Sequence, residues 1–213
     1  MVAAVAMLAF FAVPAAKKFL DSFGSTGSAG SMIEAAISSA RAIAAKEHRY
    51  AGIRFQFDRD GPLQGNQYMI FIIHDFEKTG YANGFRAVKG VEPVKLPTTT
   101  GVMDLEYYPA LPSDSLTLVD TTSFSIVFSP SGKLVLHEVR TEWISLDMEA
   151  KFVDDGEGIL GLVEELGRKS FIIYEKKKFK NAFEQGDAAL SAYLGTLQPV
   201  YVNAYTGEII SQD

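Results

Sequence analysis

The first fifty residues, MVAAVAMLAFFAVPAAKKFLDSFGSTGSAGSMIEAAISSARAIAAKEHRY (1–50), decide how the rest of the chain is interpreted. Residues 1–16 carry no charge, and Lys17 and Lys18 follow at once. Pro14 stands inside the apolar run, where a proline removes one helical hydrogen bond and weakens the helix. We predict an apolar helical stem over residues 1–23, apolar on all sides like a helix surrounded by lipid or by other stems.

A glycine- and serine-rich break is predicted next, over residues 24–31, because each glycine in a helix interior costs about 1 kcal/mol. Ser31 is followed three residues later by Glu34, the spacing of a capping box. Beyond it, apolar side chains recur at helical spacing, at Ile33, Ala36, Ile37, Ala40, Ile43 and Ala44. This pattern predicts an amphipathic helix over residues 32–48 with one face for a sheet.

The length of the stem leaves three interpretations open. At 1.5 Å per residue, residues 1–16 extend about 24 Å, short of the ~30 Å apolar core of a bilayer. A secretory signal peptide usually has a basic residue before its apolar run, and none stands there. A buried core helix fits the length, but chain termini usually lie at the surface. We favour the third interpretation, in which the run is the remaining part of a longer stem.

Composition bounds the class of protein. The chain has 213 residues, of which 47% are hydrophobic and 22% charged, so a packed domain of ordinary size is expected. It has no cysteine, which excludes a disulfide framework, a cysteine nucleophile and thiolate metal sites. A net charge of −6 argues against nucleic acid as the main partner, because phosphate binding depends on Lys and Arg.

Residues 32–213 are predicted to form one globular domain, rich in strands after the helix. Alternating or continuous apolar runs bounded by turn residues predict strands at 52–58, 68–74, 102–107, 123–128, 133–139, 170–174, 200–204 and 208–210. Residues 75–97 show no period and are predicted to be an irregular loop, residues 143–152 extend the sheet, and residues 179–197 have helical spacing. The predicted fold class is α+β, with a long N-terminal helical spine packed on a mostly antiparallel sheet.

No arrangement of chemically active side chains stands out. His48, His74 and His137 are scattered, and none has a partner at metal-ligand spacing. The acidic turns DRDG (58–61) and DDGEG (154–158) lack the spacing of a calcium loop, and phosphate-loop and nucleophile-elbow motifs are absent. We therefore predict no catalytic, cofactor-binding or metal-binding residues, and no enzyme activity.

One basic cluster is present, at Arg168, Lys169, Lys176, Lys177, Lys178 and Lys180. Lysines at a helix start oppose the helix dipole, and Phe179 alone supplies an interleaved aromatic side chain. A solvated helix start is therefore the favoured interpretation, and a nucleic-acid partner is unlikely by this pattern.

Three segments together carry a family resemblance. The predicted helix contains Ala40-Arg41-x-x-Ala44, and two later segments read SIVFSPSGKLVL (125–136) and PVYVNAYTGEII (199–210). Taken in this order they resemble the type IV pilin-like proteins, and most closely the minor pseudopilins of type II secretion and related minor pilins of the GspH/FimT type. In that family the helix ends in Ala-Arg-x-x-Ala, a later hairpin carries a Phe-x-Pro-x-Gly turn, and a glycine-turned hairpin closes the domain.

The resemblance implies a function without catalysis. The chain would be a minor subunit of an envelope fibre that assembles through its N-terminal helix. Before assembly the stem would sit in the inner membrane and the domain in the periplasm, and its partners would be other pilin-like subunits. The alternative is an anchored or secreted envelope protein whose α+β domain binds a ligand.

The family's precursor has a basic leader, a glycine at the cleavage point, then an aromatic residue and a glutamate, and none of these precedes the stem here. We expect the codons upstream of Met1 to supply this junction in frame. A stop codon directly before Met1, with no such junction, would contradict that expectation.

Overall fold

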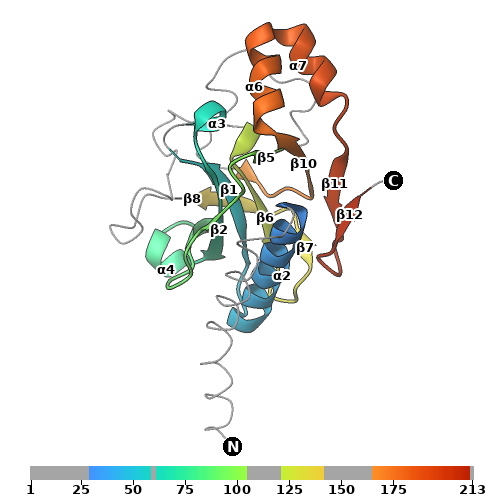
Figure 1. Ribbon diagram of the computed structural model, residues 1–213. Helices are drawn as coiled ribbons and strands as arrows, with labels where there is room; N and C mark the ends of the chain where they lie inside the picture. The colour runs from blue at the N-terminus through green and yellow to red at the C-terminus, as the bar shows by residue number, and fades with distance from the viewer. Residues whose placement is uncertain (1–28, 59–60, 105–120, 142–164, 212–213) are drawn as a thin grey trace, which may run out of the picture.

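The computed structural model describes residues 29–58, 61–104, 121–141 and 165–211 (Figure 1). The described helices are α2 (Ala29–Glu47), α3 (Gly61–Gln64), α4 (Phe76–Thr79), α6 (Lys176–Gln185) and α7 (Asp187–Leu194). The strands are β1 (Ala51–Phe57), β2 (Gln67–His74), β3 (Gly84–Ala87), β4 (Val94–Lys95), β5 (Thr100–Asp104), β6 (Phe124–Phe128), β7 (Leu134–Val135), β8 (Glu138–Thr141), β9 (Glu165–Leu166), β10 (Ser170–Glu175), β11 (Pro199–Val202) and β12 (Ile209–Ser211).

The strands form two sheets. The larger has the order β7-β6-β1-β2-β3-β8-β9, with β4 also paired to β2. Its neighbours are antiparallel except β3 and β8, which run parallel. The smaller sheet has the order β12-β11-β10-β5 and is antiparallel throughout. Because β1 is flanked by β2 on one side and β6 on the other, it lies in the interior of the larger sheet.

Helix α2 packs on one face of the larger sheet, where Figure 1 shows it lying across β6 and β1. Its face of Ile33, Ala36, Ile37, Ala40 and Ala44 is fully buried, as the helical spacing predicts. The odd positions of β1, Ile53 and Phe55, meet this face, because alternate residues of a strand point to the same side. The smaller sheet adds Val102, Phe171 and Val202 to the same core, which therefore joins both sheets to the helix.

The larger sheet curls until its last strand returns to its own outer face. The even positions of β1 point there, and Arg54 is only 3% exposed. Its Nη1 donates to Oε1 of Glu165 in β9 at 2.6 Å, and Ser125 Oγ of β6 donates to the same oxygen at 2.7 Å. Removing one partner of a charged pair buried this deeply strongly destabilises a protein, because the other charge is left unpaired. The pair therefore holds β9 against β1.

A second apolar cluster lies between the smaller sheet and the helices α6 and α7, which sit together at one end of the molecule (Figure 1). Met103, Ile172 and Tyr174 point toward these helices, and Phe179 and Leu194 pack against them. The smaller sheet is thus buried on both faces, which explains why SFIIYE (170–175) is almost continuously apolar.

The predicted fold is wrong in its main feature. The α+β class stands, but among the described residues there is no long helical spine packed on one sheet. The described part has five helices, of which the longest is α2 with 19 residues, and two sheets. The physical reason is that β1, β2 and β6 are buried on both faces, so the core is built mainly between layers of strands. The predicted stem over residues 1–23 lies outside the described residues.

Several element predictions also need correction. Gly30 and Ser31 are already helical in α2, so Ser31 does not cap this helix, since tertiary packing overrides a weak local preference. Residues 75–97 are not an irregular loop but contain α4, β3 and β4. The predicted helix over 179–197 is two helices, divided at Gly186, whose φ of 98° few other residues adopt. Residues 143–152 lie outside the described part.

The hydroxyl of Tyr174 yields a stability prediction. Tyr174 is 2% exposed and its oxygen has no hydrogen-bond partner among the described residues, whereas Tyr193 Oη accepts from the Glu175 backbone N–H at 3.0 Å. We expect Tyr174→Phe to leave the free energy of unfolding unchanged or to raise it by up to about 1 kcal/mol, because it removes an unsatisfied buried group. Tyr193→Phe should lower it by about 1 kcal/mol.

Denaturant unfolding of the two variants, which differ from the wild type by one oxygen each, measures both effects. A loss in Tyr174→Phe as large as that in Tyr193→Phe would contradict the prediction.

Candidate functional site

Arg41 of α2 occupies the point where the helix meets two turns. Its Nε donates to the carbonyl of Gly132, in the β6–β7 turn, at 2.8 Å. Its Nη1 donates to the carbonyl of Thr206, in the β11–β12 turn, at 2.7 Å. The planar guanidinium presents donors in a fixed fork, so one side chain holds both turns at once. We call Arg41 with these two turns the Arg41 junction.

Each turn approaches the arginine because it carries a glycine in the left-handed region. Gly132 has φ +75° and Gly207 has φ +72°, conformations that side chains other than glycine rarely adopt. A Cβ on Gly132 would lie 3.2 Å from Arg41 Nε, and one on Gly207 would lie 3.2 Å from Arg41 Cδ. The glycines therefore provide both the turn geometry and the space for the guanidinium.

The two turns also bind each other. The Leu134 backbone N–H donates to the carbonyl of Ala204 at 2.8 Å, which joins β7, at the edge of the larger sheet, to the β11–β12 hairpin of the smaller one. Phe128 packs near Gly207 beneath this contact. The Arg41 junction therefore connects α2 to both sheets, and it unites the three segments that carried the family resemblance.

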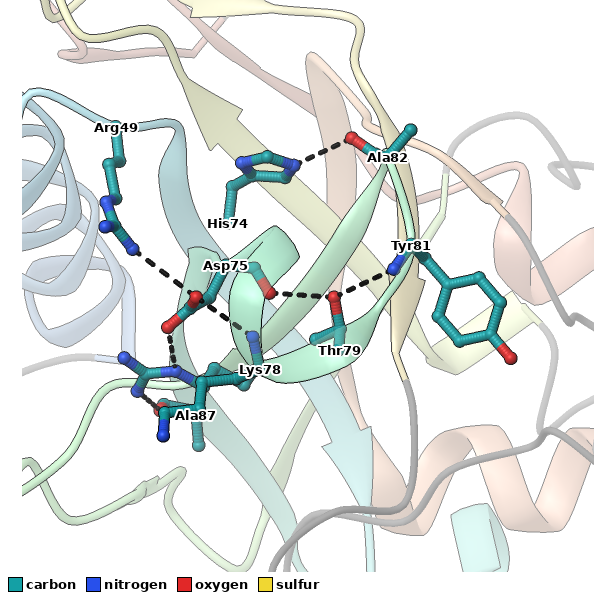
Figure 2. Close-up of polar contacts among 9 residues, drawn as sticks. Arg49, His74, Asp75, Lys78, Thr79, Tyr81, Ala82 and Ala87 are labelled. Carbon is teal, nitrogen blue, oxygen red and sulfur yellow. Dashed lines mark hydrogen bonds and ion pairs between the residues drawn. The ribbon is translucent and has the colours of Figure 1, made fainter.

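A second polar centre lies where β2 ends, around Asp75 (Figure 2). Asp75 is 4% exposed and accepts from Arg86 Nε at 2.6 Å, with Arg49 Nη1 3.5 Å from its other oxygen. Its carboxylate also accepts from the Lys78 backbone N–H and so caps α4. Thr79 Oγ1 donates to the Asp75 carbonyl at 2.8 Å, which completes the turn seen in Figure 2.

Burial and partners act in opposite directions on Asp75. Burial by itself would raise the pKa of its carboxyl, because it disfavours the charged form. The hydrogen bond and positive charge of Arg86 outweigh that effect, with help from Lys78 and Arg49, and they hold the pKa below its usual range. Asp75 is therefore an ionised structural anchor with both oxygens engaged, and a proton-transfer role does not suit it.

An aromatic cluster borders this centre. The ring centres of His74 and His137 lie 6.1 Å apart, and Tyr50 packs on His137 at 4.3 Å. Phe85 lies 5.6 Å from His74 and 5.5 Å from His137. Two of the three histidines that are scattered along the sequence therefore lie close together in the structure, because β3 pairs with both β2 and β8. His48 is exposed at the end of α2, with φ 53°.

Most side chains of the predicted basic cluster contact an acidic side chain or turn toward the protein interior. Lys178 pairs with Glu175 at 2.8 Å, Lys180 lies 3.9 Å from Glu184, and Arg168 pairs with Asp104. Lys176 turns inward, with its Nζ 2.9 Å from the Gly65 carbonyl and 4.7 Å from the centre of the Phe57 ring. Burial lowers the pKa of Lys176 to about 8, with Lys95 adding to the effect and Asp58 opposing it.

Asp58, the first residue of the DRDG segment, makes local hydrogen bonds. Asp58 Oδ2 accepts from the backbone N–H and side-chain amide of Asn66, at 3.0 and 3.1 Å. The DDGEG segment lies outside the described residues. Within the described part of the chain, no group of three or more His, Asp or Glu side chains gathers to hold a metal ion. Across residues 29–58, 61–104, 121–141 and 165–211, no helix is long and apolar enough to cross a membrane.

The chain matches no family model, no curated protein and no solved structure. The pilin-like family therefore remains a resemblance of the sequence, and the function rests on the geometry described above.

The Arg41 junction predicts a substitution effect. A lysine at position 41 keeps the charge but loses the fork, so it cannot donate to both carbonyls in the same geometry. We expect Arg41→Lys to lower the free energy of unfolding by about 1–3 kcal/mol and to speed amide exchange at Gly132 and Gly207. Lys46→Ala, an exposed change on the same helix, should stay within about 0.5 kcal/mol of the wild type.

Denaturant unfolding and hydrogen exchange measure this effect. Equal midpoints for Arg41→Lys and the wild type would mean that the junction does not stabilise the domain.

Asp75 predicts a pH dependence. Because its pKa is lower in the folded state, its contribution to stability is present above the unfolded pKa of about 3.9 and is lost as pH falls through the folded value. Asp75→Asn should therefore lower the free energy of unfolding by about 1–3 kcal/mol at pH 7, and the difference from wild type should shrink toward pH 3.

Urea unfolding at pH 7 and pH 3 checks this dependence. Glu77→Gln, an exposed change in the first turn of α4, is the matched control and should show little difference at either pH. A deficit in Asp75→Asn that persists unchanged at pH 3 would refute the linkage.

Proposed function

We propose that this chain is a non-catalytic minor subunit of a pilin-like envelope fibre, of the type II secretion or type IV pilus kind. The apolar N-terminal segment inserts in the inner membrane and then joins other subunits, and the domain from α2 onward is the exposed head. The correction of the fold removes the long spine from this argument. The proposal therefore depends on the apolar segment and on the head alone.

The Arg41 junction is the observation that carries the proposal. The three segments that resemble the family lie far apart in the sequence, and Arg41 is 91 residues from Gly132 and 165 from Thr206. Chance similarity in three unrelated stretches gives no reason for them to meet at one side chain. Their union supports the proposal that they form one structural unit, in which the helix is fixed to both sheets.

This arrangement suits a subunit that transmits force or position through α2. The helix is held along its length by the core and at Arg41 by both turns, so a load on its N-terminal end reaches both sheets. A ligand-binding envelope protein, the alternative, does not need such a connection between its N-terminal helix and the two sheets.

Cysteine cross-linking of the full chain in the cells that make it tests the proposal, because the protein has no cysteine of its own. A single cysteine in the apolar segment, as in Ala4→Cys or Ala12→Cys, is labelled with a thiol-reactive photo-cross-linker. On illumination it should form adducts with chains that carry a pilin-type N-terminal segment. Lys89→Cys, on the exposed turn after β3, is the control and should form fewer adducts.

Mass spectrometry of the adducts identifies the partner chains. A full chain whose Ala4→Cys and Ala12→Cys forms stay uncross-linked, and which leaves the membrane fraction as a monomer, would overturn the proposal and favour the ligand-binding alternative.

A further inference from the structure

The pair His74 and His137 has a chemistry that the Arg41 junction does not use. Both rings are partly buried, at the end of β2 and just before β8, and their centres lie 6.1 Å apart with 55° between the ring planes. Tyr50 and Phe85 pack around them and limit how far either ring can turn. Imidazole is the commonest metal ligand in proteins, so two imidazoles held close together can form part of a transition-metal site.

The hydrogen bonds fix the tautomer of each ring. His74 Nε2 lies 2.7 Å from the carbonyl oxygen of Ala82, and His137 Nδ1 lies 2.5 Å from that of Glu138. A carbonyl oxygen only accepts, so each of these nitrogens carries the proton. In the neutral rings the lone pairs are therefore on His74 Nδ1 and His137 Nε2. Figure 2 shows the free nitrogen of His74 pointing away from Ala82.

This pattern is the one that metal-binding histidines use. A ligating histidine almost always donates its other ring N–H to a carbonyl or carboxylate, which orients the ring and leaves the second nitrogen for the metal. Both rings satisfy that condition through backbone carbonyls. Neither lone-pair nitrogen has a hydrogen-bond donor among the described residues.

The separation of the rings also fits. With metal–nitrogen bonds of about 2.0–2.1 Å and a ring nitrogen roughly 1 Å from the ring centre, two imidazoles on one metal place their centres about 4.5–6.3 Å apart. The observed 6.1 Å lies at the upper end of that range, which corresponds to a wide nitrogen–metal–nitrogen angle such as tetragonal Cu²⁺ provides. A tetrahedral angle places the centres about 5.2 Å apart, so Zn²⁺ requires the two rings to approach by about 1 Å.

The arginine side chains of this region have partners other than the histidines. Arg49 and Arg86 both lie against Asp75, and Arg140 lies 3.5 Å above the ring of Tyr81. The cationic side chains next to the histidines are therefore engaged, and they do not compete for the ring nitrogens. Glu138, exposed and adjacent to His137, adds negative charge at the same end of the sheet.

We propose that His74 Nδ1 and His137 Nε2 together bind one divalent transition-metal ion of the class that prefers imidazole, such as Cu²⁺ or Zn²⁺. Water completes the coordination, since the described residues offer no third side-chain ligand. The site joins β2 to the β7–β8 segment, and binding therefore stabilises the larger sheet where it begins to curl. It does not depend on the proposed fibre function, because it uses none of the residues of the Arg41 junction.

Copper titration of the full chain without an affinity tag tests the site, because Cu²⁺ binds most tightly among these ions. We expect one Cu²⁺ per chain with two nitrogen ligands in the electron paramagnetic resonance spectrum. His74→Phe and His137→Phe keep an aromatic ring in the cluster but remove the ligand. Each should weaken binding by about 10-fold or more, since even loss of a residue that only orients a metal ligand typically costs that much.

His48→Asn is the matched control, because it removes the third histidine and asparagine tolerates the positive φ at this position. It should bind Cu²⁺ as the wild type does. Wild-type affinity in both phenylalanine variants, a loss in His48→Asn equal to theirs, or no stoichiometric binding by the wild type would each overturn the proposal.

A measurement on the wild type alone covers the case in which a variant fails to fold. Diethylpyrocarbonate modifies accessible imidazoles, and mass spectrometry locates the modified residues. Zn²⁺ should protect His74 and His137 several-fold while His48 reacts at an unchanged rate. Equal rates at His74 and His137 with and without Zn²⁺ would refute the site.

Discussion

The fork of Arg41 is the contact on which the arrangement of the layers depends. Helix α2 is amphipathic and would pack on many apolar sheets, so its apolar face alone does not fix where it lies along the strands. Arg41 supplies that information, because its two donors reach two particular carbonyls in turns that belong to different sheets. Hydrogen bonds from a charged donor are among the stronger ones in proteins, and two of them fix both position and direction.

A buried ion pair also fixes the packing on the face of the larger sheet opposite α2. Arg54, Ser125 and Glu165 meet where apolar side chains such as Ile72 and Val127 otherwise form the packing. An apolar substitute of similar volume would often be as stable, so this buried pair is weak support for stability in itself. Its effect on geometry is clearer. The two charges are paired in one position of β9 over β1, and a shift of β9 would leave a charge unpaired.

The sequence predicted the local elements well and their assembly poorly. Alternation in β1 and the apolar run of β2 identified two strands, which the structure pairs, and glycines 132 and 207 marked two turns that the structure contains. The sequence did not predict the parallel pairing of β3 with β8 or the contact of β9 with β1. Each joins segments that no local period connects.

The candidate sites show the same contrast between local features, which the sequence predicts, and long-range contacts, which it does not. Arg41 belongs to the Ala-Arg-x-x-Ala pattern, but the sequence does not predict its acceptors. They lie 91 and 165 residues away and are backbone carbonyls, which every residue has. His74 and His137 stand far apart along the chain, so metal-ligand spacing in the sequence does not connect them. β3 pairs with both β2 and β8, and this arrangement brings the two histidines together although no local pattern in the sequence connects them.

The pairing of β8 with β9 has a consequence for how this fold can vary. Val139 stands opposite Glu165, and Glu138 opposite Leu166, so the two ends of the connection between β8 and β9 are held close together by strand pairing. Closing a connection between fixed, adjacent ends becomes only slowly more costly as it lengthens, by about 0.6 kcal/mol for each doubling. A connection of different length between β8 and β9 therefore costs little in stability, while the buried Arg54–Glu165 pair keeps the two strands in place. A change of length at this position can alter the surface of the protein without altering its core.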